Sequence, residues 1–283
     1  MTIAEHLTQG RRALEDAGVP GAEAALDAEL LARTVLGWDR ATLVSRRGET
    51  TEPAFEAAYA ALLARRARRE PVAYILGDRE FWGLPFEVTP DVLIPRPETE
   101  LIVEEALAAF GGGQPPATVI DICTGSGCLA VTLAREFGGA DLVATDISAA
   151  AIDVARRNAR RHGVSSRIDF RVADLLDGIA GFADLIVSNP PYVARRETAT
   201  LAPEVRDHEP HVALFAGDDG LDVYRRLLPA ARQRLTRTGK LVVEVGHDQA
   251  DAVAALADGA GLGLEHTRQD LQGITRTLMF GVE

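Results

Sequence analysis

The residues best suited to chemistry are Asn189 to Tyr192, Asn-Pro-Pro-Tyr, which directly follow the apolar run 184–188. The two prolines fix the backbone and carry no N–H, so the carbonyl oxygens around them remain available as acceptors. Together with the Asn189 side-chain oxygen, these carbonyls can accept hydrogen bonds from a planar –NH2 group. Asn and Pro are also common where a strand simply runs into a loop. The complete tetrapeptide nevertheless indicates a site that holds an amide or exocyclic amine while its nitrogen reacts.

A glycine turn at residues 123–127, Cys-Thr-Gly-Ser-Gly, is the second such feature, and it follows the apolar run 118–122. Glycines permit a tight turn and the close approach of a ligand, and a following helix would offer free N–H groups. The turn matches neither the Gly-x-Gly-x-x-Gly nor the P-loop pattern. Asp121 would repel a pyrophosphate. The turn therefore favours a cofactor with positive charge, such as S-adenosylmethionine with its sulfonium and ammonium groups.

Carboxylates stand at the ends of three successive predicted strands, at Asp121, Asp146 and Asp174. Asp146 lies about 20 residues beyond the glycine turn, where an acid binds ribose hydroxyls in a βαβ nucleotide site. Asp174 is expected beside the same pocket, where it could accept a hydrogen bond from an adenine amine. Each carboxylate alone is compatible with a solvated loop, but the set of three predicts a cofactor pocket.

Alternating strands and helices must position these residues. Strands are predicted at 118–122, 142–145, 168–172, 184–188 and 241–245, and helices at 128–137, 149–162, 220–235 and 249–257. Ser148 is a suitable N-cap and Gly163 a suitable stop for the helix between them. This alternation predicts a parallel, doubly wound α/β sheet. Two final strands at 264–267 and 275–281, with no helix between them, predict an antiparallel hairpin at one edge.

The first part of the chain is predicted to be a small all-α domain over residues 1–73, because its apolar residues recur with helical spacing. A hairpin linker is predicted over 74–95 and the α/β domain over 96–283, with Pro97 opening a helix. Four arginines stand near the end of one predicted helix: Arg65, Arg66, Arg68 and Arg69. We expect a solvated face that complements the helix dipole there, in preference to a docking patch for an acidic partner.

Composition narrows the functional classes. The 283 residues carry a formal net charge of −12, which disfavours a protein whose main partner is a nucleic-acid backbone. The two cysteines, Cys123 and Cys128, are close together in sequence, so a structural disulfide is unexpected and a reducing compartment fits. The N-terminus does not resemble a signal peptide, and no apolar stretch approaches ~20 residues. We expect a cytoplasmic monomer without a metal.

With these residues in hand, nearly the whole chain resembles the protein-(glutamine-N5) methyltransferases that modify peptide chain release factors. Asn-Pro-Pro-Tyr is shared with amino-methyltransferases of DNA, whereas the helical N-terminus and the Ile-Pro-Arg-Pro-Glu-Thr-Glu segment at 94–100 are far more specific. One departure is Cys123, where that family more often has glycine. The resemblance is carried by segments 70–77, 80–83, 93–100, 121–127, 189–192, 217–221 and 270–276.

The resemblance implies a class I methyltransferase fold, Rossmann-like, with a seven-stranded sheet. It implies S-adenosylmethionine as cofactor and, as substrate, the glutamine of the Gly-Gly-Gln loop of release factors, docked by the helical domain. Asn189, Pro190, Pro191 and Tyr192 would grip that glutamine, and the segment Pro97–Thr99 would close over the methionine end of the cofactor. The residues implied to line the cofactor pocket are Asp121, Cys123, Thr124, Gly125, Ser126, Gly127, Asp146, Asp174, Leu175 and Asn189.

An amide nitrogen is a poor nucleophile because its lone pair is delocalised into the carbonyl. We therefore predict that Asn189 Oδ1 and the Pro190 carbonyl accept the two amide N–H bonds and aim the lone pair, while Tyr192 packs against the amide plane. Two alternatives stay open. The same platform could hold a flipped adenine or cytosine in nucleic acid, or the chain could be a non-catalytic cofactor-binding scaffold.

Overall fold

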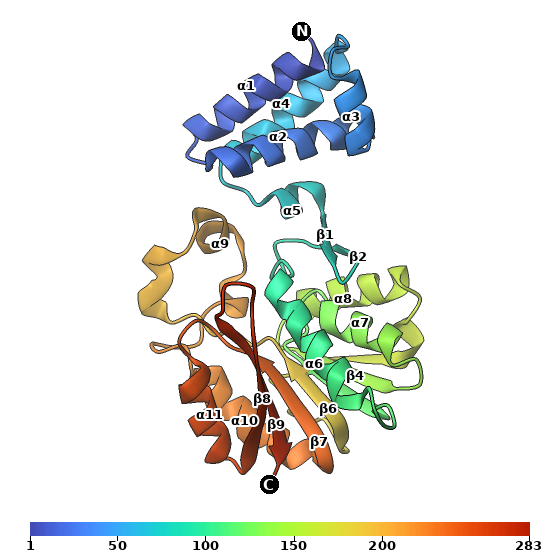
Figure 1. The fold of residues 1–283 in the computed structure, drawn as a ribbon, viewed down its shortest axis with the longest axis vertical. Coiled ribbons are helices and arrows are strands. Elements are labelled where there is room, and N and C mark those ends of the chain that lie inside the picture. The colour runs from blue at the N-terminus through green and yellow to red at the C-terminus, as the bar shows by residue number, and fades with distance from the viewer. The chain divides into compact units, whose positions relative to one another are not determined.

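The computed structural model describes all 283 residues, and the chain forms two compact units (Figure 1). The helical unit comprises Met1–Gly77 together with Ala202–His208, and the sheet unit comprises Asp78–Leu201 together with Glu209–Glu283. The predicted boundary after residue 73 thus falls inside helix α5 (Val72–Leu76), and the predicted linker is divided between the units. Its hairpin, β1 (Asp78–Phe81) and β2 (Leu84–Glu87), belongs to the sheet unit.

The helical unit is built on amphipathic helices, as the sequence predicts. Thr2 and Glu5 form a capping box at the start of α1, and Gly37 ends α2 in the left-handed conformation. Leu14, Leu31 and Tyr59 are buried in its core. The helices of residues 1–77 that precede α5 are α1 (Ile3–Asp16), α2 (Gly21–Leu36), α3 (Arg40–Arg46) and α4 (Pro53–Ala67).

The arginines at the end of α4 form the predicted solvated face only in part, since Arg68 is exposed and Arg66 is buried. Arg66 is only 1% exposed, and its guanidinium donates to Glu23, Asp27 and Glu204 at 2.6–2.7 Å. Glu204 belongs to the short helix α9 (Pro203–His208), which the sequence analysis did not foresee. The prediction is wrong for Arg66 because a guanidinium with several carboxylate partners can be buried, whereas an unpaired one cannot.

The sheet unit contains a seven-stranded sheet in the order β5-β4-β3-β6-β7-β9-β8. Neighbouring strands from β5 to β7 are parallel, and β9 is antiparallel to both β7 and β8. This confirms the doubly wound sheet with an antiparallel final hairpin. The strands are β3 (Thr118–Ile122), β4 (Asp141–Asp146), β5 (Ile168–Val172), β6 (Ala183–Ser188), β7 (Leu235–Glu244), β8 (Leu262–Gln269) and β9 (Thr275–Val282).

Helices cover both faces of this sheet and enclose two apolar cores (Figure 1). The helices α6 (Glu100–Phe110), α7 (Cys128–Glu136) and α8 (Ala149–Arg161) pack on one face. The helices α10 (Asp222–Arg234) and α11 (Ala250–Asp258) pack on the other. Ser148 caps α8 as predicted, since its hydroxyl accepts from the Ala151 N–H. No helix of the chain is long and apolar enough to cross a membrane.

Candidate active site

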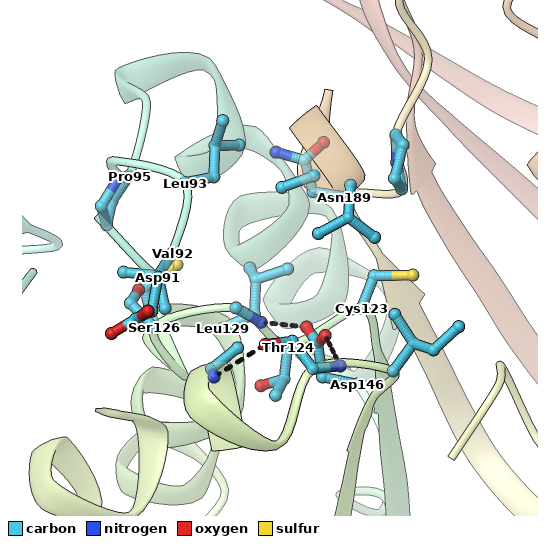
Figure 2. Close-up of a pocket in the computed structure, with 18 of the residues that line it drawn as sticks. Asp91, Val92, Leu93, Pro95, Cys123, Thr124, Ser126, Leu129, Asp146 and Asn189 are labelled. Atoms are coloured by element: carbon cyan, nitrogen blue, oxygen red, sulfur yellow. Dashed lines mark hydrogen bonds between the residues drawn. The ribbon is translucent and has the colours of Figure 1, made fainter. Parts of the chain in front are cut away.

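Two adjoining cavities lie at the carboxyl ends of the central strands, the edge where ligands bind in open α/β sheets. The first is lined by the glycine turn, by Asn189 and by residues from 91 to 99 that precede α6 (Figure 2). The second is lined by Asp174, Leu175 and Arg226. Because the cavities share lining residues, they form two lobes of one elongated site. The shared residues are Cys123, Asp146, Ile147, Pro191 and Val212.

The glycine turn has the tight geometry that the sequence predicts. Gly125 and Gly127 both have positive φ, and a Cβ on Gly127 would come within 2.9 Å of the Ala155 Cβ on α8. Glycine is therefore required at 127 for both conformation and space. Cys123 also adopts a positive φ of 61°, which is uncommon for a residue with a side chain. Glycine would adopt this conformation without strain.

Asp146 anchors the turn to the end of β4. Its carboxylate accepts the backbone N–H groups of Gly125 and Ser148, each at 2.9 Å (Figure 2). Burial raises the pKa of Asp146, while the N–H groups of Ser148 and Gly125 oppose that shift. Because Asp146 lines both lobes, it occupies the position at which the sequence analysis expects the ribose contact.

Two predicted cofactor residues, Gly127 and Asp121, line neither cavity. Gly127 lies against Ala155 of α8, and Asp121 lies deeper. Its side chain is completely buried, and its Oδ2 accepts from the Thr124 hydroxyl at 2.6 Å and from the Ala130 N–H at 3.1 Å. Burial raises the pKa of this carboxyl to about 7. Asp121 thus lies behind the turn and supports its shape, whereas Cys123, Thr124, Gly125 and Ser126 line the cavity.

Asp174 and Leu175 lie in the second lobe, as expected from their place after β5. The Asp174 carboxylate accepts from the Arg226 guanidinium at 2.6 Å. Sequence analysis missed Arg226 because the only pattern in α10 is the apolar periodicity of its core face, which includes the buried Tyr224. No pattern in the sequence marks which of its arginines borders a cavity.

Asn189 carries the most informative polar atom of the site. Its Nδ2 donates to the Thr99 hydroxyl at 2.9 Å, whereas its Oδ1 is buried and has no hydrogen-bond partner. Buried polar atoms without a partner are rare in folded proteins, and each calls for an explanation. Since Asn189 and Pro191 line the first lobe, Oδ1 is suited to accept a hydrogen bond from a bound ligand.

The other residues of the tetrapeptide are placed differently. Neither Pro190 nor Tyr192 belongs to the lining of either lobe. Pro190 is buried, and Tyr192 is half-buried. The Tyr192 hydroxyl donates to Glu244 Oε1 at 3.1 Å, and its ring packs against the apolar core beneath α10. The neighbouring Glu244 carboxylate raises the pKa of Tyr192, so this phenol remains a hydrogen-bond donor.

Glu244, at the end of β7, is a residue that the sequence analysis missed. It is 2% exposed, and it accepts from both the Tyr192 hydroxyl and the Thr99 hydroxyl, the latter at 2.6 Å. Burial raises its pKa to about 7. A signal for it existed, because an acid at the end of an apolar strand is the same feature that singled out Asp121 and Asp146.

The segment before α6 forms the remaining wall, through Asp91, Val92, Leu93, Pro95 and Thr99. Besides Glu244, which accepts from Thr99, a second buried acid holds this segment in place. Glu209 accepts from the backbone N–H of Ile94 at 3.1 Å and also from the Arg96 guanidinium. Thr99 lies in the short helix η1 (Pro97–Thr99), within the stretch predicted to close over the cofactor.

The sheet order, the glycine turn and the cavity at the carboxyl edge define a class I methyltransferase fold. Residues 5–77 match the family model of the PrmC N-terminal domain, and residues 99–205 match that of the methyltransferase small domain. The chain belongs to the release factor glutamine methyltransferase family. It is 45% identical to the release factor glutamine methyltransferase of Cereibacter sphaeroides over 98% of this chain and 97% of that protein.

A further relative agrees with this assignment, and a solved structure agrees with the fold. The release factor glutamine methyltransferase of Geobacter sulfurreducens is 44% identical over 98% of this chain and 95% of that protein. Among solved structures, the T. thermophilus 16S rRNA N2 G1207 methyltransferase in complex with AdoMet and guanosine superposes with a TM-score of 0.54. The alignment covers 73% of this chain and 50% of that chain at 18% identity, so it supports the fold alone.

Proposed function

We propose that this protein transfers a methyl group from S-adenosylmethionine to the side-chain amide nitrogen of the glutamine in the Gly-Gly-Gln motif of peptide chain release factors. The observation that carries the proposal is the buried, unpartnered Oδ1 of Asn189, which lies on the cavity formed by the glycine turn. An amide –NH2 group is a complementary donor for this oxygen. The family to which the chain belongs supplies the substrate class.

The elongated site fits the cofactor. The turn from Cys123 to Gly127 would hold the methionine part, Asp146 would accept the ribose hydroxyls, and Asp174 with Leu175 would border the adenine in the second lobe. The positive φ of Gly127 and its close approach to Ala155 let the turn pack tightly against α8 while Gly125 faces the cavity without a side chain. When bound, S-adenosylmethionine would supply the methyl group of its sulfonium. The sulfur would keep the electron pair of the C–S bond that breaks.

The chain's own residues would act by orientation. Asn189 Oδ1 and the Pro190 carbonyl accept the two N–H bonds of the substrate amide, so its nitrogen lone pair points into the cavity. Acceptors that hold these bonds also favour pyramidalisation of the nitrogen as it gains the methyl carbon. The nitrogen afterwards releases one of its two protons to solvent and becomes a neutral N-methyl amide. Tyr192 lines neither lobe and would support this platform from behind, through its hydrogen bond to Glu244.

The test is the variant Asn189→Ala, assayed with a release factor and labelled cofactor. We expect turnover to fall by at least about 100-fold, the loss typical when an oriented hydrogen-bonding group of the transition state is removed. Cofactor affinity, measured by calorimetry, should change by less than about tenfold because the glycine turn and Asp146 remain. Turnover within a few-fold of the unaltered enzyme, with the cofactor still bound, would contradict the role given to Asn189.

The substrate is tested separately. Mass spectrometry of release factor peptides after the reaction should find a single added methyl on the Gly-Gly-Gln glutamine, and a release factor with that glutamine changed to alanine should stay unlabelled. Incubation with DNA or RNA under the same conditions should give no labelled base, because the chain is strongly acidic. Labelled adenine or cytosine would instead favour an amino-methyltransferase of nucleic acid.

The helical unit is proposed to dock the release factor, with the enzyme acting as a monomer. Light scattering of the purified chain should give the mass of a single 30.3 kDa polypeptide. Titrating the release factor against the enzyme, with and without substitutions on the exposed faces of α1 to α4, would measure the docking directly. Affinity unchanged by any such substitution would contradict the docking role.

A further inference from the structure

Four polar side chains in the sheet unit form a connected, largely buried chain of hydrogen bonds. Asn189 Nδ2 donates to Thr99 Oγ1 at 2.9 Å, and the Thr99 hydroxyl lies 2.6 Å from Glu244 Oε2. The Tyr192 hydroxyl reaches the other carboxylate oxygen at 3.1 Å. We propose that Thr99 and Glu244 are positioning residues, which fix the orientation of the Asn189 amide so that Oδ1 faces the substrate. The proposal rests on the role given to Asn189 above.

We call this chain of hydrogen bonds between Asn189, Thr99, Glu244 and Tyr192 the relay. The direction of each hydrogen bond in it follows from the chemistry of the groups. An ionised carboxylate accepts hydrogen bonds and has none to donate, so both hydroxyls must donate to Glu244. The Thr99 hydroxyl carries one hydrogen, and once that hydrogen is given to Glu244 only lone pairs remain for Asn189. Asn189 must therefore present its –NH2 group to Thr99. Its Oδ1 is then left on the side away from Thr99, as the structure shows by the absence of a partner.

Protonation of Glu244 would remove this constraint. A carboxylic acid can donate to Thr99 Oγ1, which frees the Thr99 hydroxyl to donate to Asn189. The Asn189 amide could then turn over and present its –NH2 group to the substrate. Two –NH2 groups that face each other cannot form a hydrogen bond, so the grip on the glutamine would be lost. The relay thus requires an ionised Glu244 and makes turnover sensitive to its titration.

Glu244 titrates in a pH range that an activity assay can cover, because burial raises its pKa to about 7. Glu98 of η1 raises the pKa further, whereas the hydroxyls of Thr99 and Tyr192 and the charge of Arg276 on β9 lower it. Cys128 of α7 and Tyr224 of α10 also interact with this carboxylate. We therefore expect kcat to rise with pH as Glu244 ionises near neutrality.

The first experiment removes the middle of the relay. Thr99→Val keeps the shape of the side chain but loses the hydroxyl, so kcat with release factor should fall by at least about tenfold. The matched variant Thr99→Ser restores the hydroxyl and should stay within about threefold of the unaltered enzyme. Cofactor affinity of both variants should change by less than about threefold. A Thr99→Val enzyme with kcat within twofold of the unaltered enzyme overturns the proposal.

The second experiment removes the titration. Glu244→Gln keeps an oxygen that can accept from Thr99, so the enzyme should remain active while its kcat no longer declines as the pH falls from about 8 to 6. Cofactor affinity is measured over the same range, because Asp121 behind the glycine turn also has a pKa of about 7. A decline in kcat that persists unchanged in Glu244→Gln overturns the proposal.

The two proposals fail in different ways. If Asn189→Ala is fully active, the proposed grip on the amide is wrong and the relay has no substrate to serve. If Asn189→Ala is inactive while Thr99→Val and Glu244→Gln behave like the unaltered enzyme, the grip stands and only the relay is wrong. Thermal unfolding of each variant, compared with Thr99→Ser, identifies any loss of activity that is due to misfolding.

Discussion

Each of the two units buries a cluster of polar side chains. In the helical unit the central guanidinium is fully paired, whereas in the sheet unit one acceptor oxygen has no partner. In the helical unit, Arg66 is 1% exposed and its guanidinium donates to three carboxylates within 2.7 Å. In the sheet unit, Glu244 is buried without a cation in hydrogen-bond contact, and the chain of hydrogen bonds that begins at this residue ends at an oxygen with no partner. The first cluster is closed, whereas the second is open at Asn189.

This difference separates a structural task from a functional one. A closed cluster satisfies its charges within the protein, so its removal should act on stability. An open cluster leaves one acceptor unsatisfied in the free protein, at a cost that a substrate amide would offset on binding. Its removal should therefore act on turnover more than on stability. Each of the following experiments tests one side of that distinction.

Breaking the closed cluster should have the largest effect. Arg66→Met leaves the Asp27 carboxylate buried without its cation, which typically costs about 3–5 kcal/mol, whereas Glu204 keeps its second partner, Arg69. The chain has one tryptophan in each unit, Trp38 in the helical unit and Trp82 in the sheet unit. In a Trp82→Phe background, urea unfolding followed by tryptophan fluorescence reports on the helical unit alone.

Arg68→Met is the matched control for Arg66→Met. Arg68 is exposed on the same turn, so its replacement should change the free energy of unfolding by less than about 0.5 kcal/mol. Replacing Arg66 and Asp27 together by apolar residues should recover much of the lost stability, because the buried carboxylate is then removed with its cation. Equal losses from Arg66→Met and Arg68→Met would show that the cluster is not a structural element.

The stability of the sheet unit should decline as the pH rises. Glu244 has its pKa raised from 4.5 to about 7 in the folded state, so folding favours its protonated form. The contribution of Glu244 to the free energy of unfolding is fully present below about pH 4.5. This contribution, on the order of 3 kcal/mol, is lost as the pH rises through about 7. Urea unfolding of a Trp38→Phe protein, read from Trp82, measures this slope. Glu244→Gln should reduce this slope but not abolish it, because the pKa of Asp121 is also raised to about 7; an unchanged slope would contradict the burial of an ionisable Glu244.

The sequence predicted the elements and the cavity because their signals are local. The glycine turn, the Ser148 cap and the alternation of apolar runs each involve residues close together in the chain. The two buried clusters were not predicted because their partners are distant: Arg66 and Glu204 are 138 residues apart, and Thr99 and Glu244 are 145 apart. Only the tertiary fold brings such residues together. An arginine looks the same in the sequence whether its partners are water or distant carboxylates.

Asp146 provides an intermediate case, since its charge is satisfied by backbone N–H groups and not by a cation. Asp146→Asn would place an –NH2 group against one of these donors and loosen the glycine turn. We expect the cofactor dissociation constant to rise by about 10- to 100-fold, since a hydrogen bond to a charged group is worth about 1.5–3 kcal/mol. Calorimetry measures it, with Asp169→Asn on the exposed face of β5 as control. Equal affinities of the two variants would contradict the cofactor role of Asp146.

The smallest effect is expected where the same chemical pair is exposed. Arg226 donates to Asp174 at 2.6 Å, the same distance that separates Arg66 from Asp27, but the side chains of Arg226 and Asp174 are 57% and 37% exposed. Water and salt screen such a pair, so Arg226→Gln should lower the free energy of unfolding of the sheet unit by less than about 1 kcal/mol. The loss should shrink further as ionic strength rises. Because the two pairs share their chemistry and their distance, a loss as large as that of Arg66→Met would show that burial does not set the difference between them.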